Sequence, residues 1–518
     1  MNLSKYKRIV FSVTTGSLLL VALFLFLNGT SQAARADASD LFVSSTGSGS
    51  ACTQAAPCDL QTALSQSING DTLYFAGGTY TGSGGAVVTI TKSINLYGGW
   101  DGTTTTPALR DPNTYLTVLD GESLRRVIVI TGTINITPTI DGFTITGGNA
   151  TGLGGGLFAG SDAGGGIYSL NASPIIQRNV ITGNLASTQA GVRAMGGGIY
   201  IKDAPAPATV RYNQILSNTA STGTKQGEGA GIFLEGAADI VNNTFRDNVA
   251  CKSCSQAYGG GLMVGWTTDQ ALIAYNLFES NQAKKGAGIY LTWSAVQVSH
   301  NTIISNTATI WGAGLYSYYD RGSYINANMV KSNNSTVYGG GLSIYITKPP
   351  GPTNLINNVI INNHAGIHGG GVYANSDWNL SAITMAHNTL VGNGEGVFVN
   401  KNLTATLINN IVVSHTLGIT LADPSGGILA DHTLFWANTD DGMRGSNPVD
   451  GDPAFEGLSG SNHHISAASA ARNTGVNAGV TVDFDGTARP KETYYDIGAD
   501  EYWLSSDVYL PLVVNSSP

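Results

Sequence analysis

The residues best suited to chemistry in this 518-residue chain are aromatic side chains that recur beside a glycine motif. The motif, Gly-x-Gly followed by an aliphatic residue, starts at residues 164, 196, 229, 259, 286, 312, 339, 369 and 394. In most copies the residue after the aliphatic one is Tyr or Phe, and further rings lie just before or after the motif. Aromatic faces can stack on sugar rings, while Tyr hydroxyl and Trp ring N–H groups can form hydrogen bonds.

If the residue after the aliphatic one points outward, these rings lie on one face beside bare glycine backbone. We therefore predict that an extended carbohydrate binds there through seven contact residues: Tyr258, Trp266, Tyr290, Trp293, Trp311, Tyr316 and Tyr338. Tyr319 continues the Trp266 and Trp293 series on the next copy. The alternative interpretation is that loops fold over this face and the rings form a second small core, because Tyr and Phe are also favourable strand residues.

Acid–base groups give a weaker signal, because catalysis needs such groups with placed partners. Asp320 precedes Arg321, but no acidic cluster flanks them in neighbouring repeats, and His364 and His368 have no acidic partner visible in the sequence. We assign no catalytic residue. Several aspartates near residues 440–452 are able to hold a structural calcium ion, yet no EF-hand spacing appears, so we interpret them as turn residues and assign no metal or cofactor.

The four cysteines form two closely spaced pairs, Cys52 with Cys58 and Cys251 with Cys254. The C-x-x-C spacing of the second pair suits a redox dithiol or half a zinc site, but no second C-x-x-C or His pair stands nearby. In an oxidising compartment a local disulfide is the default for each pair. We predict two disulfides.

A second motif, Asn-x-apolar-x-x-Asn, alternates with the glycine motif, so the chain is a repeat of about 25–33 residues. Apolar residues stand two positions after and three positions before the first Asn of each copy, the alternation of half-buried strands. Such a short unit cannot bury its own apolar face, so the units must stack as a solenoid of parallel strands. We expect the first asparagines to form an internal ladder: Asn179, Asn213, Asn243, Asn276, Asn301, Asn328, Asn358 and Asn388.

The two alternating motifs, as in GGGIY and N-x-I-x-x-N, resemble the right-handed parallel β-helix of the pectin-lyase-like superfamily over about residues 40–440. The resemblance implies an all-β solenoid with an N-terminal cap, in which Leu60, Ala63, Leu64 and Ile68 suggest a short helix. Residues 451–455 and 483–502 resemble the closing module of secreted bacterial β-helix proteins, the choice-of-anchor Q region. We expect this module to close the far end of the solenoid.

The N-terminus has the features of an export signal, because basic residues precede an apolar stretch and small residues near Ala36 and Ala38. An uncleaved membrane anchor is the rival interpretation. The expected organisation is a signal peptide at 1–38, a cap and first coil at 39–92, repeats at 93–440, a closing module at 441–504 and a tail at 505–518. No membrane span is expected after cleavage, and the protein should be secreted or held at the cell surface.

Composition and resemblance together leave two functions open. The net charge of -9 argues against a nucleic-acid partner. We expect a monomer that binds a polysaccharide or a cell-surface glycan without catalysis. The alternative is a polysaccharide lyase or glycoside hydrolase, which rests on the superfamily alone. A polygalacturonase resemblance would need four motifs, of which only the first and last have matches, at residues 438–440 and 489–491.

Overall fold

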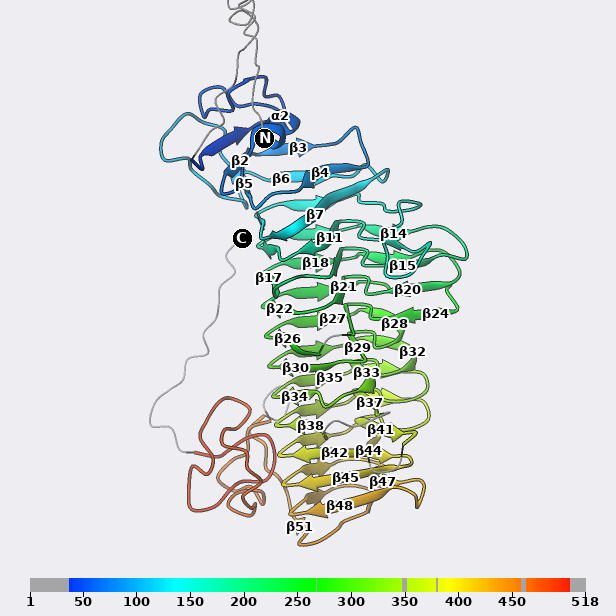
Figure 1. The fold of residues 1–518 in the computed structure, drawn as a ribbon. Helices are drawn as coiled ribbons and strands as arrows, with labels where there is room; N and C mark the ends of the chain where they lie inside the picture. Colours follow the sequence, from blue (N-terminus) through cyan, green and yellow to red (C-terminus); the bar gives the residue numbers. More distant parts are fainter. Residues whose placement is uncertain (1–36, 267, 347–351, 379–380, 458–462, 504–518) are drawn as a thin grey trace, which may run out of the picture. The chain divides into compact units, whose positions relative to one another are not determined.

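Short strands stack in register along the chain and form four long parallel sheets (Figure 1). The computed structural model describes residues 37–503, apart from 267, 347–351, 379–380 and 458–462. The predicted signal peptide therefore lies almost wholly outside the described residues, as does the predicted tail. No helix in the described part of the chain is long and apolar enough to cross a membrane.

One coil shows how the four sheets are built. Strand β26 (Thr268–Ala274) lies in the first 14-stranded sheet, β27 (Leu277–Glu279) in the second, β28 (Gln282–Lys285) in an 8-stranded sheet and β29 (Ile289–Thr292) in a 13-stranded sheet. Each strand pairs in parallel with its equivalent in the next coil. The predicted parallel β-helix is thus confirmed.

The sheets span most of the described chain. The first 14-stranded sheet runs from β1 (Asp40–Val43) to β48 (Gly427–Asp431), and the second from β3 (Gly78–Tyr80) to β51 (Val449–Asp450). The 13-stranded sheet runs from β4 (Ala86–Ile90) to β50 (Asp440–Gly442), and the 8-stranded sheet from β10 (Asp162–Ala163) to β40 (His364–Ala365). Parallel pairing therefore continues past the expected boundary at residue 440, as far as Asp450.

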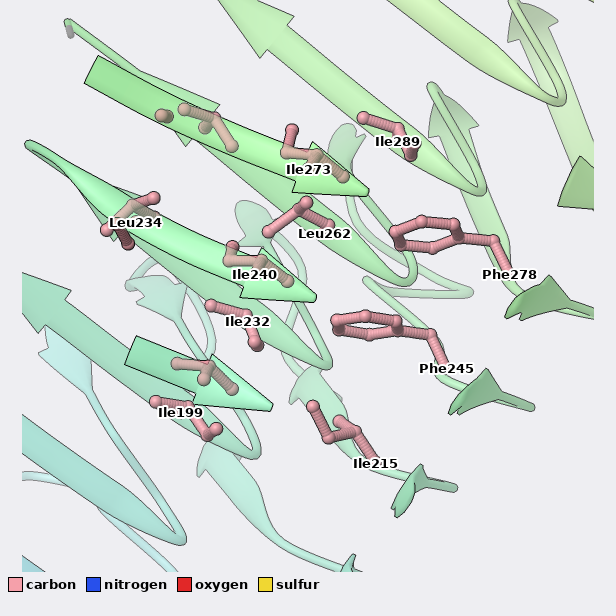
Figure 2. Packing of buried hydrophobic residues seen from close by; sticks show 14 of the residues in the cluster. Ile199, Ile215, Ile232, Leu234, Ile240, Phe245, Leu262, Ile273, Phe278 and Ile289 are labelled. Carbon is pink, nitrogen blue, oxygen red and sulfur yellow. The ribbon is translucent and has the colours of Figure 1, made fainter. Parts of the chain in front are cut away.

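Aliphatic and phenylalanine side chains fill the interior in layers, one layer per coil (Figure 2). Ile232, Leu262 and Ile289 stack from the 13-stranded sheet, facing Phe245 and Phe278 from the second 14-stranded sheet. All of these side chains are fully buried. The alternation of apolar residues on either side of each asparagine therefore correctly predicts which side chains point into the interior.

The predicted asparagines form a buried column at the turn between the two 14-stranded sheets. Asn301 Oδ1 accepts hydrogen bonds from the backbone N–H and from Nδ2 of Asn276, at 2.9 and 3.0 Å. Its own Nδ2 donates to the Ile273 carbonyl oxygen at 2.8 Å and to Asn328 Oδ1 at 3.0 Å. The pattern repeats along the column, so each amide is saturated by its neighbours.

A second, equally regular ladder was not predicted, although the sequence signal for it is the second Asn of the same motif. Asn306 accepts from Asn281 and donates to Asn333, as in the first column. His415 takes the place of one asparagine in this column: its Nδ1 accepts the Asn393 backbone N–H at 3.1 Å, and its own backbone N–H donates to Asn438 Oδ1 at 2.8 Å. The other members repeat the pattern: Asn184, Asn218, Asn248 and Asn363.

The predicted N-terminal helix is present as α2 (Leu60–Gln66). Asp59 caps it by accepting a hydrogen bond from the Thr62 backbone N–H at 3.0 Å. Leu60 and Ala63 are buried against the first coil. Both predicted disulfides, Cys52–Cys58 and Cys251–Cys254, are present.

The C-terminal segment after Asp450 does not close the end of the solenoid as expected. It packs along the outer face of the second 14-stranded sheet, beside the last coils (Figure 1). Asn409 Nδ2 donates to the Val476 carbonyl oxygen at 2.6 Å, and the Ala499 N–H donates to Thr389 Oγ1 at 2.9 Å. The physical reason is that outward Ile411, Val413 and Leu434 on this sheet offer it an apolar surface.

In the last coil the Arg444 guanidinium lies over the Phe435 ring, 5.3 Å from its centroid. Arg444 also forms ion pairs with Asp441 and Asp450. Two of the aspartates considered as calcium ligands therefore share one arginine of the protein as their ion-pair partner.

Candidate functional site

The 8-stranded and 13-stranded sheets meet at the glycine motifs, and the rings gather where they meet. The first glycine of each motif has a left-handed backbone, with φ of 59° at Gly286 and 57° at Gly312. A Cβ at Gly286 would lie 2.6 Å from the Ile289 carbonyl oxygen, so glycine is required for this turn. The side chains just before the glycines consequently align in one column.

That column contains Tyr258, Lys285, Trp311, Tyr338 and His368. They follow one another in parallel register from the end of β24 (Gln256–Tyr258), through β28, to the end of β32 (Thr307–Trp311) and beyond. All five side chains are half-buried. Neighbours in the column are about 4.8 Å apart along the solenoid.

Tyr290 and Tyr316 are buried, contrary to the prediction that they face a ligand. They do point out of the solenoid interior, but only 5% and 1% of their surfaces are exposed. The Tyr258 ring lies 5.0 Å from Tyr290, and the Trp311 ring 5.7 Å from Tyr316. The column described above covers them, so the rings after the aliphatic residues form a second core, as in the alternative interpretation.

A second set of rings, two of them exposed, lies at the far end of the 13-stranded sheet's strands. Trp266, Trp293 and Tyr319 follow β25 (Leu262–Gly265), β29 and the equivalent position of β33 (Leu315–Asp320), each with a left-handed φ of 51–56°. Trp266 and Trp293 are 41% and 40% exposed. Earlier coils place Asn171, Asp203 and Gly236 at this position, residue types that tolerate the conformation better than a bulky ring.

Two half-buried rings that the prediction omitted connect these groups. Tyr318 and Tyr345, on β33 and β37 (Leu342–Ile346), have ring centroids 5.3 Å apart. The Tyr318 ring centroid also lies 4.0 Å from that of Tyr319, which in turn lies 4.3 Å from that of Trp293, with the last two planes tilted by 33°. Tyr318 and Tyr345 each stand two residues after an outward-pointing position of their strand. The strand alternation that located Tyr316 would therefore also have located them.

We call the exposed and half-buried rings the aromatic face: Tyr258, Trp266, Trp293, Trp311, Tyr318, Tyr319, Tyr338 and Tyr345. Ring contacts connect its members directly or through the buried tyrosines. Trp266 stands apart, since its ring contact is with Phe158 at 6.3 Å. The aromatic face therefore extends over four successive coils, from Tyr258 to Tyr345.

Few charged groups adjoin the aromatic face. Lys285 lies among the rings, and its burial lowers the pKa of the ammonium group. Tyr345 donates a hydrogen bond to Asp377, which also lies 3.4 Å from Lys401 Nζ. His368 Nδ1 lies 3.4 Å from Glu395 Oε2, an acidic partner that the sequence did not reveal because it comes from the following coil.

The other candidate catalytic residues serve the fold. Asp320 is buried and accepts hydrogen bonds from Ser317, Thr353 and the backbone N–H groups of Gly322 and Ser323. His364 is exposed on β40.

The two partial polygalacturonase matches have structural roles too. Asn438 bonds to the Val412 carbonyl oxygen and to Asp441, and Arg489 is buried in an ion pair with Glu501 at 2.6 Å.

A shallow depression lies elsewhere, on the outer surface of the first 14-stranded sheet. Its lining includes Asp239, Leu272, Gln297 and Tyr324. Among the described residues that line the depression, Asp239 and Tyr324 are the ionisable ones. The depression therefore offers no carboxylate paired with a second acid or base. The aromatic face is the better candidate site.

Known proteins resemble the chain in fold. Residues 125–267 match the family model of the right handed beta helix region. Solved structures similar to the chain include a pectate lyase, Pel9A, with 12% identity and a TM-score of 0.33, covering 91% of this chain and 98% of that one.

Two further solved structures are similar over most of the chain. XylC in complex with xylose has 10% identity and a TM-score of 0.42, covering 89% of this chain and 98% of that one. The PL6 family alginate lyase AlyGC has 16% identity and a TM-score of 0.43, covering 83% of this chain and 55% of that one. No curated protein matches the chain.

Proposed function

We propose that the aromatic face binds an extended polysaccharide or cell-surface glycan without cleaving it. The observation that carries this proposal is the pair formed by Trp293 and Tyr319 on adjacent coils, whose ring centroids lie 4.3 Å apart with the planes tilted by 33°, while Trp293 is 40% exposed. Coils repeat at about 4.8 Å, close to the length of one sugar unit, so a chain lying along the solenoid meets a new ring at each unit. Each contact is weak, but linked contacts raise the overall affinity.

The placement of the ionisable groups favours binding over catalysis. Lys285 and His368 belong to the same column but are three coils apart, about 14 Å. Acid and base catalysis on one bond needs both groups within hydrogen-bond reach of the reacting atoms. This separation is too large for one glycosidic bond.

The proposal is tested by exposing the purified protein to a panel of polysaccharides and measuring two quantities. Retention of the protein by the polymer reports binding, and new reducing or unsaturated ends report cleavage. We expect retention that strengthens with oligosaccharide length and no new ends. A protein that is retained by none of the polymers would contradict the proposal.

One observation favours a second candidate function, a polysaccharide lyase or glycoside hydrolase. It is the pair formed by Glu395 and His368, the last residue of the column that begins at Tyr258. This pair is able to exchange a proton with a bound sugar. If the protein does generate new chain ends and a His368→Asn variant does not, the enzyme is the correct function.

We further propose that the protein is exported through the N-terminal signal and works outside the cytoplasm. The two disulfides support this location, because such bonds persist in oxidising compartments. Expression in a secreting host followed by N-terminal sequencing should give a mature chain beginning after Ala36 or Ala38. A full-length protein retained in the membrane fraction would contradict export by cleavage.

A further inference from the structure

Lys285 is an unusual charged residue because aromatic rings surround its ammonium group. Its Nζ atom lies 5.9 Å from the ring centroids of Tyr258, Trp311 and Tyr318, and 6.0 Å from that of Tyr316. Two of these rings, Tyr258 and Trp311, are its neighbours in the column, one coil before and one coil after. The ammonium group is thus held at the centre of the aromatic face.

Within the described residues, no carboxylate lies within 4.0 Å of Lys285 Nζ. The acidic groups closest to the aromatic face already have partners. Glu228, one coil before Tyr258 in the same column, is buried and paired with Arg193 at 2.6 Å. Asp377 is shared by Tyr345 and Lys401, and Glu395 faces His368.

A half-buried ammonium group without a counter-ion is energetically costly, and the ring faces compensate it only in part. An anionic group that enters beside the rings would regain this energy, because a charge-assisted hydrogen bond is stronger where water is partly excluded. A neutral sugar hydroxyl would regain much less.

We propose that Lys285 binds the anionic group of the glycan, so that the ligand of the aromatic face is an acidic polysaccharide and not a neutral one. This inference rests on the proposed function, since it names the class of ligand for the same face. The rings at Tyr258 and Trp311 would then contact the sugar units before and after the charged one. Lys285 is the specificity-determining residue, and the rings supply the remaining affinity.

The test compares two forms of one polymer. Binding of the parent protein to a polyuronate is measured against binding to the same polymer after its carboxyl groups have been reduced to alcohols. A sulfated glycan and its desulfated form make a second pair, which distinguishes a sulfate from a carboxylate as the anion. We expect at least tenfold tighter binding to the charged form of one pair, falling as ionic strength rises.

Variants locate the charge responsible. Lys285→Met should abolish the preference and leave weak binding to both forms, whereas Lys285→Arg should retain it. Lys284→Met is the matched control, because Lys284 is the adjacent residue of β28 and donates to the Ser255 carbonyl oxygen. The polymer comparison on the parent protein needs no variant, so the proposal stays testable even if Lys285→Met does not fold.

The outcomes separate this inference from the proposed function. Equal binding of both forms by the parent, or a preference that persists in Lys285→Met, overturns the role of Lys285 and leaves glycan binding standing. Absence of binding to every polymer in either form overturns the proposed function and this inference with it.

Discussion

The asparagine ladders and the aromatic face are both built from side chains of one kind, amide or aromatic, that recur from coil to coil, but they differ in how much of each side chain stays exposed. Inside, Asn301 donates to and accepts from the coils on both sides, and 1% of its surface is exposed. Outside, Trp293 contacts Tyr319 on one side and keeps 40% of its surface exposed. A column saturated by its own neighbours stabilises the solenoid, whereas a column with a free face is available to a ligand.

Breaking the inner column should have the largest effect on stability. Asn301→Leu removes the side-chain partner of the Asn276 N–H and of the Ile273 carbonyl, and Asn328 Oδ1 keeps only the hydrogen bond from the residue 301 backbone N–H. At about 1–3 kcal/mol for each buried unsatisfied group, we expect a loss of about 3–5 kcal/mol in unfolding free energy. Urea unfolding measures it, with exposed Thr302→Leu as the control. An unchanged midpoint would show that the ladder contributes nothing.

The buried rings beneath the aromatic face should behave like the inner column and not like the exposed rings. Tyr316→Ala removes a side chain that is 1% exposed, so we expect a loss of about 3–4 kcal/mol in unfolding free energy. Trp293→Ala should cost less than about 1 kcal/mol. If thermal unfolding gave equal losses for the two variants, the division into a buried and an exposed layer would be wrong.

The single histidine in the ladders should make the inner column sensitive to acid. Burial lowers the pKa of His415 to about 4, against about 6.5 in the unfolded chain. The unfolded state therefore takes up the proton first, and stability present above pH 6.5 is lost as the pH falls toward 4, by ~3 kcal/mol.

An asparagine at this position should remove that sensitivity, because its amide can accept from Asn393 and donate to the Leu390 carbonyl without titrating. Unfolding of the parent and of His415→Asn at pH 7, 5 and 4 gives the comparison. The other histidines contribute equally to the pH dependence of both proteins, so their contributions cancel when one unfolding free energy is subtracted from the other. Parallel pH profiles would contradict the account of His415.

Among the buried features of the fold, the disulfide beside the 8-stranded sheet should contribute least to stability. Cys251→Ser with Cys254→Ser opens a short loop whose ends are only three positions apart, for which we expect a loss of at most about 2 kcal/mol in unfolding free energy. Thermal unfolding of the parent and of the double variant, both without reductant, measures this loss. A collapse of the fold in the double variant would show that the loop has a larger role.

The sequence predicted the inner column and the solenoid because a strand's alternation depends only on neighbours along the chain. The second ladder was predictable from the same motif. The aromatic face was predicted only in part, since the burial of Tyr290 and Tyr316 depends on side chains of other coils. The His368–Glu395 pair and the packing of the C-terminal segment also bring together residues distant in the chain, which spacing alone does not reveal.

The most direct test of the account is the affinity for the best-retained polysaccharide of a variant with Trp293→Ala and Tyr319→Ala. Tyr275→Ala is the matched control, because Tyr275 is also exposed, has a left-handed backbone and stacks on His300 at 4.9 Å, but lies between the two 14-stranded sheets. We predict at least tenfold weaker binding for the double variant, and parent-like binding for the control, by calorimetric titration. Parent-like binding by the double variant would show that the ligand binds elsewhere.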